Sequence, residues 1–447
     1  MVAASLEELI QERGNVAHML RNGTMAAFPF PMRSEYSNWR DEQRAWKTSA
    51  VLFDQSHHMT DVSFKGPDAI RLMSRIGVNS FAAFGKNKAK QLVACTEDGH
   101  VIGDAVLFGL DDDEVSIVGP PFVSRWAEYQ AEIGGWDVTV TRDDATPLNP
   151  LGRKNFRFQL QGPAAMGIVS ATAGGSLPDI KPFHIGEFRI AGRPVRALNH
   201  SMSKRAGLEI WGPVADGPAV LTALLEAGAP HGLRQAGAIA YSTTALESGW
   251  IGVQLPAIYT GAAMKGYREW LPATGPEAMG SIGGSFVSDR IEDYYTTPWD
   301  LGYGALVKFD HDFIGRAALE ESQRRPHRRK VWFRWNADDS ARVMRSGLLD
   351  DEAHRAKYLQ APYAVYSTWP ADSVLVDGKV AGIAIRTGYT TNVGSWYSLG
   401  ILDEAYVQNG REVTIVWGEE DGGTRKPAVE RHAQTSVRAV VSTTRLG

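Results

Sequence analysis

Apolar and polar residues alternate along the chain in short runs whose period changes from one segment to the next. Near the start, apolar residues recur at helical spacing from Leu6 to Arg21, which predicts one helix that ends at Asn22-Gly23. A second helix is predicted from Trp39 to Lys47. Both helices are expected to serve as scaffold.

Between Val51 and about Asp143 the pattern changes to strands interleaved with helices. Strands are predicted at residues 62–65, 91–96, 101–107 and 114–118, and helices at 69–76 and 122–132. A strand followed by Gly-Pro, as at Gly66-Pro67, recurs at Gly162-Pro163 and Gly212-Pro213. The interleaved strands and helices predict an α+β fold, and the recurring junctions are interpreted as related, as an old duplication would make them.

A boundary is predicted at the basic run Arg324–Lys330, and the chain after it reads as mostly strands. A nucleic-acid patch would need basic and aromatic residues together on one surface, so a solvated linker is the preferred interpretation. Strands are predicted at residues 374–380, 382–389, 395–402, 412–417 and 435–442, which favours a small barrel or sandwich. The predicted regions are therefore 1–155, 156–325 and 326–447.

Composition narrows the class of partner. The chain has 447 residues, 43% of them hydrophobic and 22% charged, with a formal net charge of −4. These values are ordinary for a globular protein of two or three domains and give no electrostatic reason to bind nucleic acid or an anionic membrane. No apolar stretch approaches the roughly 18 residues that span a bilayer, and the start lacks a signal-peptide pattern. We expect a cytoplasmic protein with a small-molecule partner.

Two polar stretches stand beside apolar runs and predict a pocket for a flat, partly charged ligand: Asp54-Gln-Ser-His-His58 and Tyr241–Trp250. Adjacent residues on a strand point to opposite faces, so only one of His57 and His58 is expected to enter the pocket, for proton transfer or hydrogen bonding. No metal site is expected, because no further histidine and carboxylate stand at ligand spacing. The single cysteine, Cys95, excludes an intramolecular disulfide and is expected to be a buried thiol.

Several separated motifs resemble the glycine-cleavage T-protein (aminomethyltransferase) superfamily, whose members bind tetrahydrofolate. The resemblance runs in order through nearly the whole chain, in the segments Asn38–Arg40, Val51–Met59, Gly66–Ala69, Gly99–Asp104, Gly207–Ile210 and Asp312–Arg316. Further segments are most similar to the bacterial tetrahydrofolate-dependent vanillate/3-O-methylgallate O-demethylases of lignin catabolism: Glu247–Trp250, Pro256–Gly261, Tyr267–Trp270, Ile282–Val287, Lys308–Phe313 and Trp417–Lys426.

This resemblance implies a three-domain fold with a central folate channel and a methyl transfer from an aryl ether to N5 of tetrahydrofolate. It implies that Tyr241 and His58 are catalytic, with Tyr241 at the ether oxygen. Gln55 and His58 would hold the neighbouring phenol oxygen. The carboxylate of Glu209 would pair with the pterin edge. Glu247 and Trp250 would complete the folate site, where the indole can stack on the ring.

Departures from the family pattern concern the substrate. Pro120, two residues after Val118, stands where the vanillate-type enzymes carry an arginine for the substrate carboxylate, and Phe28 stands where a tyrosine is expected. Losing a charge-assisted contact of about 1.5–3 kcal/mol weakens a benzoate by one to two orders of magnitude. We therefore expect a neutral or larger methoxylated aromatic that contacts Gln55, Phe28, Val118 and Pro120, unless Arg125 supplies the missing cation.

Other departures separate the chain from further branches of the superfamily. Gly103-Asp104 replaces the two consecutive aspartates of aminomethyl-transferring enzymes, and Asp312 replaces the cysteine of the non-catalytic iron–sulfur-assembly relatives. The remaining alternative is a folate-independent lyase on the same scaffold. In that case Tyr241, His58 and Glu247 would perform acid–base cleavage of a lignin-derived dimer and release formaldehyde.

Overall fold

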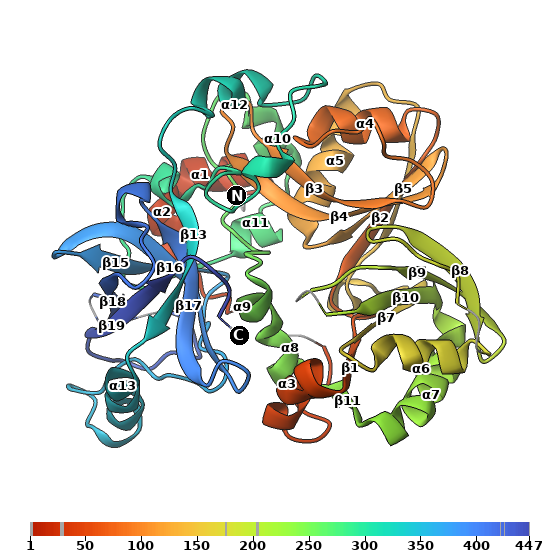
Figure 1. Cartoon of the computed structure of the whole chain (residues 1–447). Helices are drawn as coiled ribbons and strands as arrows, with labels where there is room; N and C mark the ends of the chain where they lie inside the picture. Colours follow the sequence, from red (N-terminus) through yellow and green to blue (C-terminus); the bar gives the residue numbers. More distant parts are fainter. Residues whose placement is uncertain are drawn as a thin grey trace.

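Three large β-sheets of different construction surround the short helices α8 (Ala238–Ser242) and α9 (Thr244–Ser248) (Figure 1). The computed structural model describes residues 3–26, 31–174, 177–202, 205–420, 422–423 and 425–446. The barrel lies on one side of α8 and α9 in Figure 1, and the two open sheets lie on the other. Helix α9 packs against strand β16 (Lys379–Thr390) of the barrel, and α8 packs against strand β11 (Leu233–Ala236) of an open sheet. The expectation of an α+β fold is confirmed.

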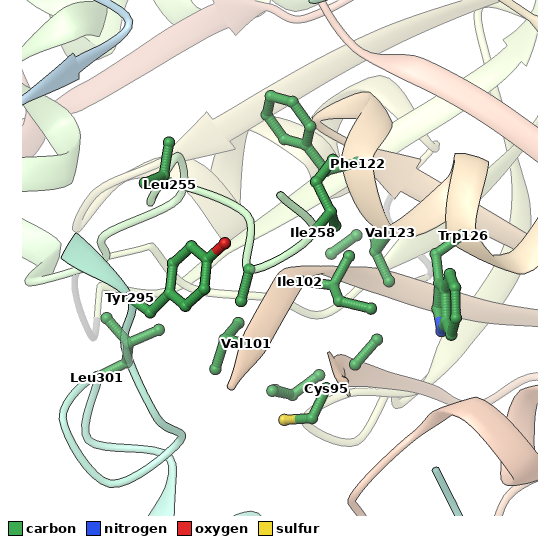
Figure 2. Packing of buried hydrophobic residues seen from close by; sticks show 14 of the residues in the cluster. Cys95, Val101, Ile102, Phe122, Val123, Trp126, Leu255, Ile258, Tyr295 and Leu301 are labelled. Carbon is green, nitrogen blue, oxygen red and sulfur yellow. The ribbon is translucent and has the colours of Figure 1, made fainter. Parts of the chain in front are cut away.

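The first sheet is antiparallel, in the order β3-β4-β5-β2-β6. Helices α4 (Ala69–Ile76) and α5 (Pro121–Ile133) pack on it, so the interleaved pattern was read correctly. Figure 2 shows Val101 and Ile102 packed against α5 residues and against Leu255, Ile258 and Leu301 from a later segment. Cys95 lies in this core with no exposed surface, as expected. The strands are β2 (Thr60–Lys65), β3 (Ala89–Cys95), β4 (Val101–Asp111), β5 (Glu114–Gly119) and β6 (Thr139–Asp143).

The second sheet has six strands in the order β11-β1-β7-β10-β9-β8, and only the β1–β11 pair among them is parallel. One face of this sheet is apolar and is covered by α6 (Ala165–Thr172) and α7 (Gly217–Gly228). Strand β1 comes from the first predicted region, so sheet pairing crosses residue 155, and the three-region division stays a prediction. The strands are β1 (Ala50–Asp54), β7 (Asn155–Gln161), β8 (Ile185–Ile190), β9 (Arg193–Leu198), β10 (Gly207–Pro213) and β11 (Leu233–Ala236).

The third sheet is a closed barrel in the order β13-β17-β16-β15-β18-β19, which decides between the two predicted architectures in favour of the barrel. Its strands are β13 (Arg329–Trp335), β15 (Asp372–Val376), β16 (Lys379–Thr390), β17 (Ser395–Leu402), β18 (Glu412–Trp417) and β19 (Thr435–Ser442). Helix α13 (Ala337–Leu349) follows β13 and packs against β19; the strand-rich interpretation had not anticipated it.

Two of the expected elements are wrong in their boundaries. The helix expected from Leu6 to Arg21 is two helices, α1 (Leu6–Arg13) and α2 (Val16–Arg21), because Gly14 has φ +77° and Asn15 caps α2. The strand expected at residues 374–380 turns back at Asp377-Gly378, where both residues have positive φ. Asp-Gly favours such a hairpin turn, so the signal was present in the sequence.

The remaining elements connect the sheets. Helix α3 (Trp39–Thr48) packs on β11, β1 and α8, and α1 packs on α10 (Lys265–Trp270). Short strand β12 (Ile282–Gly283) pairs with β14 (Trp369–Pro370), so the glycine-rich segment 280–285 joins two parts of the chain. The other elements are α11 (Pro276–Met279), α12 (Arg316–Ser322) and 3₁₀ turns at Thr146–Leu148, Val214–Asp216, Ala229–His231, Ile291–Tyr294, Gly304–Leu306 and Glu404–Tyr406. Within the described residues, none of the helices has the length and apolar character that crossing a membrane requires.

Candidate functional site

Tyr241 lies at the centre of a buried hydrogen-bonded group. Its hydroxyl accepts a hydrogen bond from Gln55 Nε2 at 3.1 Å and lies 2.9 Å from His58 Nε2. The ring packs edge-on against Phe53, with 5.2 Å between ring centroids. The fold therefore brings Gln55, His58 and Tyr241 into direct contact, although more than 180 residues separate Tyr241 from the other two.

Local structure explains how Tyr241 reaches this position. Helix α8 begins after Gly237, whose N–H donates to Glu42 on α3 at 2.9 Å. A Cβ at Gly237 would lie 2.2 Å from the carbonyl oxygen of Ser34, so this close approach requires glycine. The helix start is thus clamped between α3 and the segment before it, and the clamp fixes the direction in which Tyr241 projects.

His57 and His58 lie in a turn after β1, not on a strand, so the stated reason for their divergence was wrong. Their side chains do separate. His57 Nδ1 lies 2.8 Å from the hydroxyl of Thr146, whereas the His58 ring lies edge-on to Tyr241, with centroids 4.9 Å apart. The turn thus sends one histidine to the buried site and the other to the loop after β6.

Burial keeps both partners of the Tyr241–His58 contact uncharged at neutral pH. It lowers the pKa of His58 to about 3, helped by the nearby positive charge of Arg153. It also raises the pKa of Tyr241 above its ordinary value. The contact therefore joins a neutral imidazole and a protonated phenol, which together can hold or pass on a proton.

Further polar side chains lie near Tyr241 on the polar face of the second sheet. Gln159 on β7 accepts a hydrogen bond from Gln55 Nε2 at 3.0 Å, and Gln161 donates to the carbonyl of His200 at 2.7 Å. Glu209 on β10 stands opposite Gln159 in the register and is 4% exposed. Its carboxylate accepts from Arg157 Nη1 at 2.5 Å. A carboxylate and two amides on one buried face can bind the edge of a polar ring.

Glu247 and Trp250 lie further along the segment that begins with α8. The carboxylate of Glu247 accepts from Asn392 Nδ2 at 3.0 Å, in the connection between β16 and β17, and burial raises its pKa. Trp250 is 37% exposed, and its ring packs over Gly252. Its indole Nε1 donates to Asp104 at 2.7 Å. The folate roles expected for Glu247 and Trp250 stay predictions.

One carboxylate oxygen of Asp104 accepts hydrogen bonds from three side chains. Trp250, Tyr303 and the side-chain amide of Gln91 all donate to its Oδ2, the Tyr303 hydroxyl from 2.9 Å. Burial raises the pKa of Asp104 to about 6. Lys330 of the barrel stands near the same group, with Nζ 5.9 Å from the centre of the Tyr303 ring, and burial lowers its pKa to about 8. This cluster joins the first sheet to the barrel beside Trp250.

The expected substrate residues are placed in part. Val118 packs in a cluster with Met59, the neighbour of His58, and Pro120 is the N-cap of α5. Phe28 lies outside the described residues. Arg125 donates to the buried carboxylate of Glu277 at 2.9 Å. Its charge is therefore paired inside the protein, whereas it was expected as an alternative cation for the substrate carboxylate.

Four residues of the site were missed as functional candidates: Asp104, Arg157, Gln159 and Asn392. The segment Phe156-Arg-Phe-Gln-Leu-Gln161 alternates as a half-exposed strand would, yet Arg157, Gln159 and Gln161 are all at most 3% exposed. Alternation identifies the polar face but does not reveal that another part of the chain covers it. Asp104 carried a signal, since it was noted as a family difference and lies on a predicted strand.

Two cavities lie outside the immediate surroundings of Tyr241. One, of about 140 Å³, lies between the two open sheets and is bordered by Asp61, Phe108, Arg157 and Trp211. The other, of about 210 Å³, is bordered by His100, Glu292 and Tyr295. We place the site at Tyr241 because the buried polar groups converge there. In the parts of the chain that the structure describes, no group of three histidine, cysteine or acidic side chains is arranged to hold a metal.

The fold and the polar site define the class of protein. Residues 10–255 match the family described as the GCVT N-terminal domain. The chain superposes over 100% of its length on 98% of the glycine cleavage system aminomethyltransferase T of Bartonella henselae, with a TM-score of 0.63 at 15% sequence identity, which shows the shared fold. The chain therefore belongs to the glycine-cleavage T-protein family, as the motifs indicated.

Relatives place the chain within that family more narrowly. It is 46% identical over 443 residues to a syringate O-demethylase of Sphingobium sp. (strain NBRC 103272 / SYK-6), and the alignment covers 99% of this chain and 96% of the relative. It is 28% identical to a sesamin methylene transferase of Sinomonas sp. (strain No.22), over 86% of this chain and 85% of the relative. An aminomethyltransferase of Streptomyces avermitilis is 28% identical over 66% of this chain and 68% of the relative. The chain is thus an enzyme of the aminomethyltransferase and O-demethylase family.

Proposed function

We propose that the protein is a tetrahydrofolate-dependent O-demethylase that moves a methyl group from a methoxylated, lignin-derived aromatic to N5 of tetrahydrofolate. The observation that carries the proposal is the Tyr241 hydroxyl, held between Gln55 and His58 in a buried site. The 46% identical relative named as a syringate O-demethylase supports this reaction class.

The residues around Tyr241 fit a folate. Glu209 is a buried carboxylate beside two glutamine amides, a donor set that matches the N–H groups and ring nitrogens of a pterin edge. The side-chain oxygen Oε1 of Gln55 is buried and has no hydrogen-bond partner among the residues that the structure describes, so it offers an acceptor to a ligand. Glu209 would hold the pterin, with Glu247 and Trp250 beside the rest of the molecule. Tetrahydrofolate, when bound, supplies the amine nitrogen that accepts the methyl group.

The chain's own residues handle the leaving group. When the methyl–oxygen bond breaks, the electron pair stays on the aryl oxygen, and an unassisted phenoxide is a poor leaving group. The Tyr241 hydroxyl, kept protonated by burial, donates its proton to that oxygen. Gln55 donates a hydrogen bond to the Tyr241 oxygen and stabilises the negative charge that develops on it. His58, held neutral, orients the hydroxyl, and the tyrosinate left behind would be reprotonated by the proton that N5 loses on methylation.

We also propose that the preferred substrate is neutral or larger than vanillate. Pro120 offers no charge at the position where a carboxylate-binding arginine is expected. Arg125 is paired with Glu277, and Arg157 is paired with Glu209 and Asp61. Arg153 lies near His58, but its Nη1 donates to the backbone carbonyls of Asp143 and Asp144. These three arginines are therefore already committed inside the protein.

A product assay tests both statements. The purified protein is incubated anaerobically with neutral methoxyaromatics such as guaiacol and with acidic ones such as vanillate and syringate, with and without tetrahydrofolate. Mass spectrometry then follows 5-methyltetrahydrofolate, the demethylated phenol and formaldehyde. We expect methylfolate and phenol in equal amounts, formed fastest from neutral substrates. Formaldehyde released without folate, with the methoxy group intact, would establish the lyase instead, and faster turnover of acids would remove the role given to Pro120.

A further inference from the structure

A single buried arginine connects the candidate folate carboxylate to the first sheet. Arg157 is 3% exposed. Its Nη1 donates to Glu209 at 2.5 Å, and its Nη2 donates to Asp61 at 3.1 Å. Glu209 belongs to the second sheet and Asp61 to the first, so one guanidinium bridges two carboxylates on different sheets.

The surroundings of Arg157 fix the plane of its guanidinium. The rings of Phe108 and Trp211 lie 5.1 and 5.2 Å from its central carbon. Asp61 is itself held, because the hydroxyl of Ser116 donates to its other oxygen. A guanidinium that stacks on two rings and bonds two carboxylates has little rotational freedom, so the Glu209 oxygen that it binds is fixed as well.

The backbone of Arg157 performs a separate task. Its carbonyl accepts from the N–H of Gln55 at 2.8 Å, and its N–H donates to the Ser56 hydroxyl at 2.9 Å. The main chain of this residue thus supports the Gln55 segment, which faces the candidate substrate, while the side chain supports Glu209. A substitution of Arg157 removes the side-chain contacts and leaves these two backbone bonds available.

We propose that Arg157 is a positioning residue for the folate half of the site, acting through Glu209. This inference rests on the proposed folate role of Glu209 and deepens it. The guanidinium occupies one oxygen of the Glu209 carboxylate and so directs how the carboxylate meets the edge of the pterin. Because the hydrogen bonds and ring contacts of this side chain go to Glu209, Asp61, Phe108 and Trp211, its effect is expected on folate rather than on the aromatic substrate.

The test measures two ligands separately on the same variants. Tetrahydrofolate under anaerobic conditions and guaiacol are each titrated against Arg157→Met and Arg157→Lys, with tryptophan fluorescence as the readout. We expect Arg157→Met to bind tetrahydrofolate at least tenfold more weakly than the wild type does and to bind guaiacol with an affinity within twofold of the wild type. Arg157→Lys keeps the positive charge but cannot bond both carboxylates at once, so its tetrahydrofolate affinity should lie between those of the wild type and Arg157→Met. The lysine variant also provides the test if Arg157→Met fails to fold.

Arg125→Met is the matched control, because it also removes an arginine from a buried carboxylate, that of Glu277. It should leave both affinities within twofold of the wild type. A parallel loss of both ligands in Arg157→Met would show a merely structural role and overturn the inference, and so would unchanged tetrahydrofolate affinity. Failure of the wild-type protein to bind tetrahydrofolate would remove the proposed function and this inference with it, and that result is distinguishable because it precedes any substitution.

Discussion

The segment that carries α8 and α9 meets two polar clusters in which burial favours the uncharged form, with different consequences at neutral pH. Around Tyr241, burial keeps neutral groups neutral, since it lowers the pKa of His58 to about 3 and raises that of Tyr241. Around Trp250, burial moves charged groups toward neutrality, with the pKa of Asp104 raised to about 6 and that of Lys330 lowered to about 8. The first cluster keeps one protonation state across the physiological pH range, as a proton donor at rest requires, whereas the second changes its charge within that range.

The comparison teaches that the two clusters have separate tasks. A proton donor to a leaving phenoxide works best when it starts uncharged and dry. A group that orients an exposed indole needs only a strong acceptor, which Asp104 supplies to Trp250 and Tyr303. Each of the following substitutions affects one cluster and is predicted to spare the other.

The largest effect is expected from Tyr241→Phe, which removes the proposed proton donor and keeps the ring that packs on Phe53. We expect kcat to fall by about 10²–10⁴, the usual contribution of general acid catalysis. Steady-state kinetics with the best methoxyaromatic measures this. Tyr294→Phe is the control, because it loses a hydroxyl bonded to the Phe286 carbonyl at 3.1 Å, away from the site. A kcat within threefold of wild type for Tyr241→Phe would assign the proton to another group.

Pro120→Arg is expected to bring acidic substrates into the Tyr241 cluster. The φ of −58° and ψ of 149° at this position suit arginine, so the backbone need not change. A new charge-assisted contact of about 1.5–3 kcal/mol should lower KM for vanillate by one to two orders of magnitude. Pro163→Arg, at the corresponding strand-to-helix junction, should change nothing. An unaltered ratio of kcat/KM between vanillate and guaiacol would show that residue 120 does not face the substrate.

Asp104→Ala tests the second cluster. It leaves Trp250 Nε1 and the Tyr303 hydroxyl without their acceptor, and each buried unsatisfied group costs about 1–3 kcal/mol. We expect lower stability and roughly tenfold weaker tetrahydrofolate binding, since 1.4 kcal/mol corresponds to a factor of ten, with the affinity for guaiacol unchanged. Asp372→Ala removes another buried carboxylate whose pKa is raised to about 6, and it should lower stability alone. Equal folate affinity in both variants would contradict a folate role for the Asp104 cluster.

The smallest effect at neutral pH is expected for His58, whose burial matters for stability in acid. Because the pKa of His58 is about 3 in the folded state and ordinarily 6.5, the unfolded chain binds a proton between these values that the folded chain does not. His58 therefore costs stability as pH falls from 6.5 toward 3, by at most about 1.4 kcal/mol for each pH unit. Urea unfolding of His58→Gln should show a correspondingly flatter decline between pH 6.5 and 4. His57→Gln should decline as the wild type does, and identical slopes for all three proteins would contradict a neutral, buried His58.

Much of the secondary structure could be read directly. The strands expected at residues 395–402, 412–417 and 435–442 match β17, β18 and β19, and the helix expected at 69–76 matches α4. These elements are set by local alternation and by flanking turn residues, which a short window of sequence contains. The two boundary errors lie at Gly14 and at Asp377-Gly378, where a local turn signal ends the helix or strand although the apolar pattern continues past it.

The sequence by itself determined the family and named Gln55, His58 and Tyr241, because those residues stand in recognisable local motifs. Only the tertiary structure decided that Gln159 supports Gln55, that Arg157 bridges Glu209 and Asp61, and that Asp104 holds Trp250. The partners in these contacts lie 52 to 146 residues apart. Such pairs depend on strand order and register across whole sheets, since a one-residue slip would turn each side chain to the opposite face.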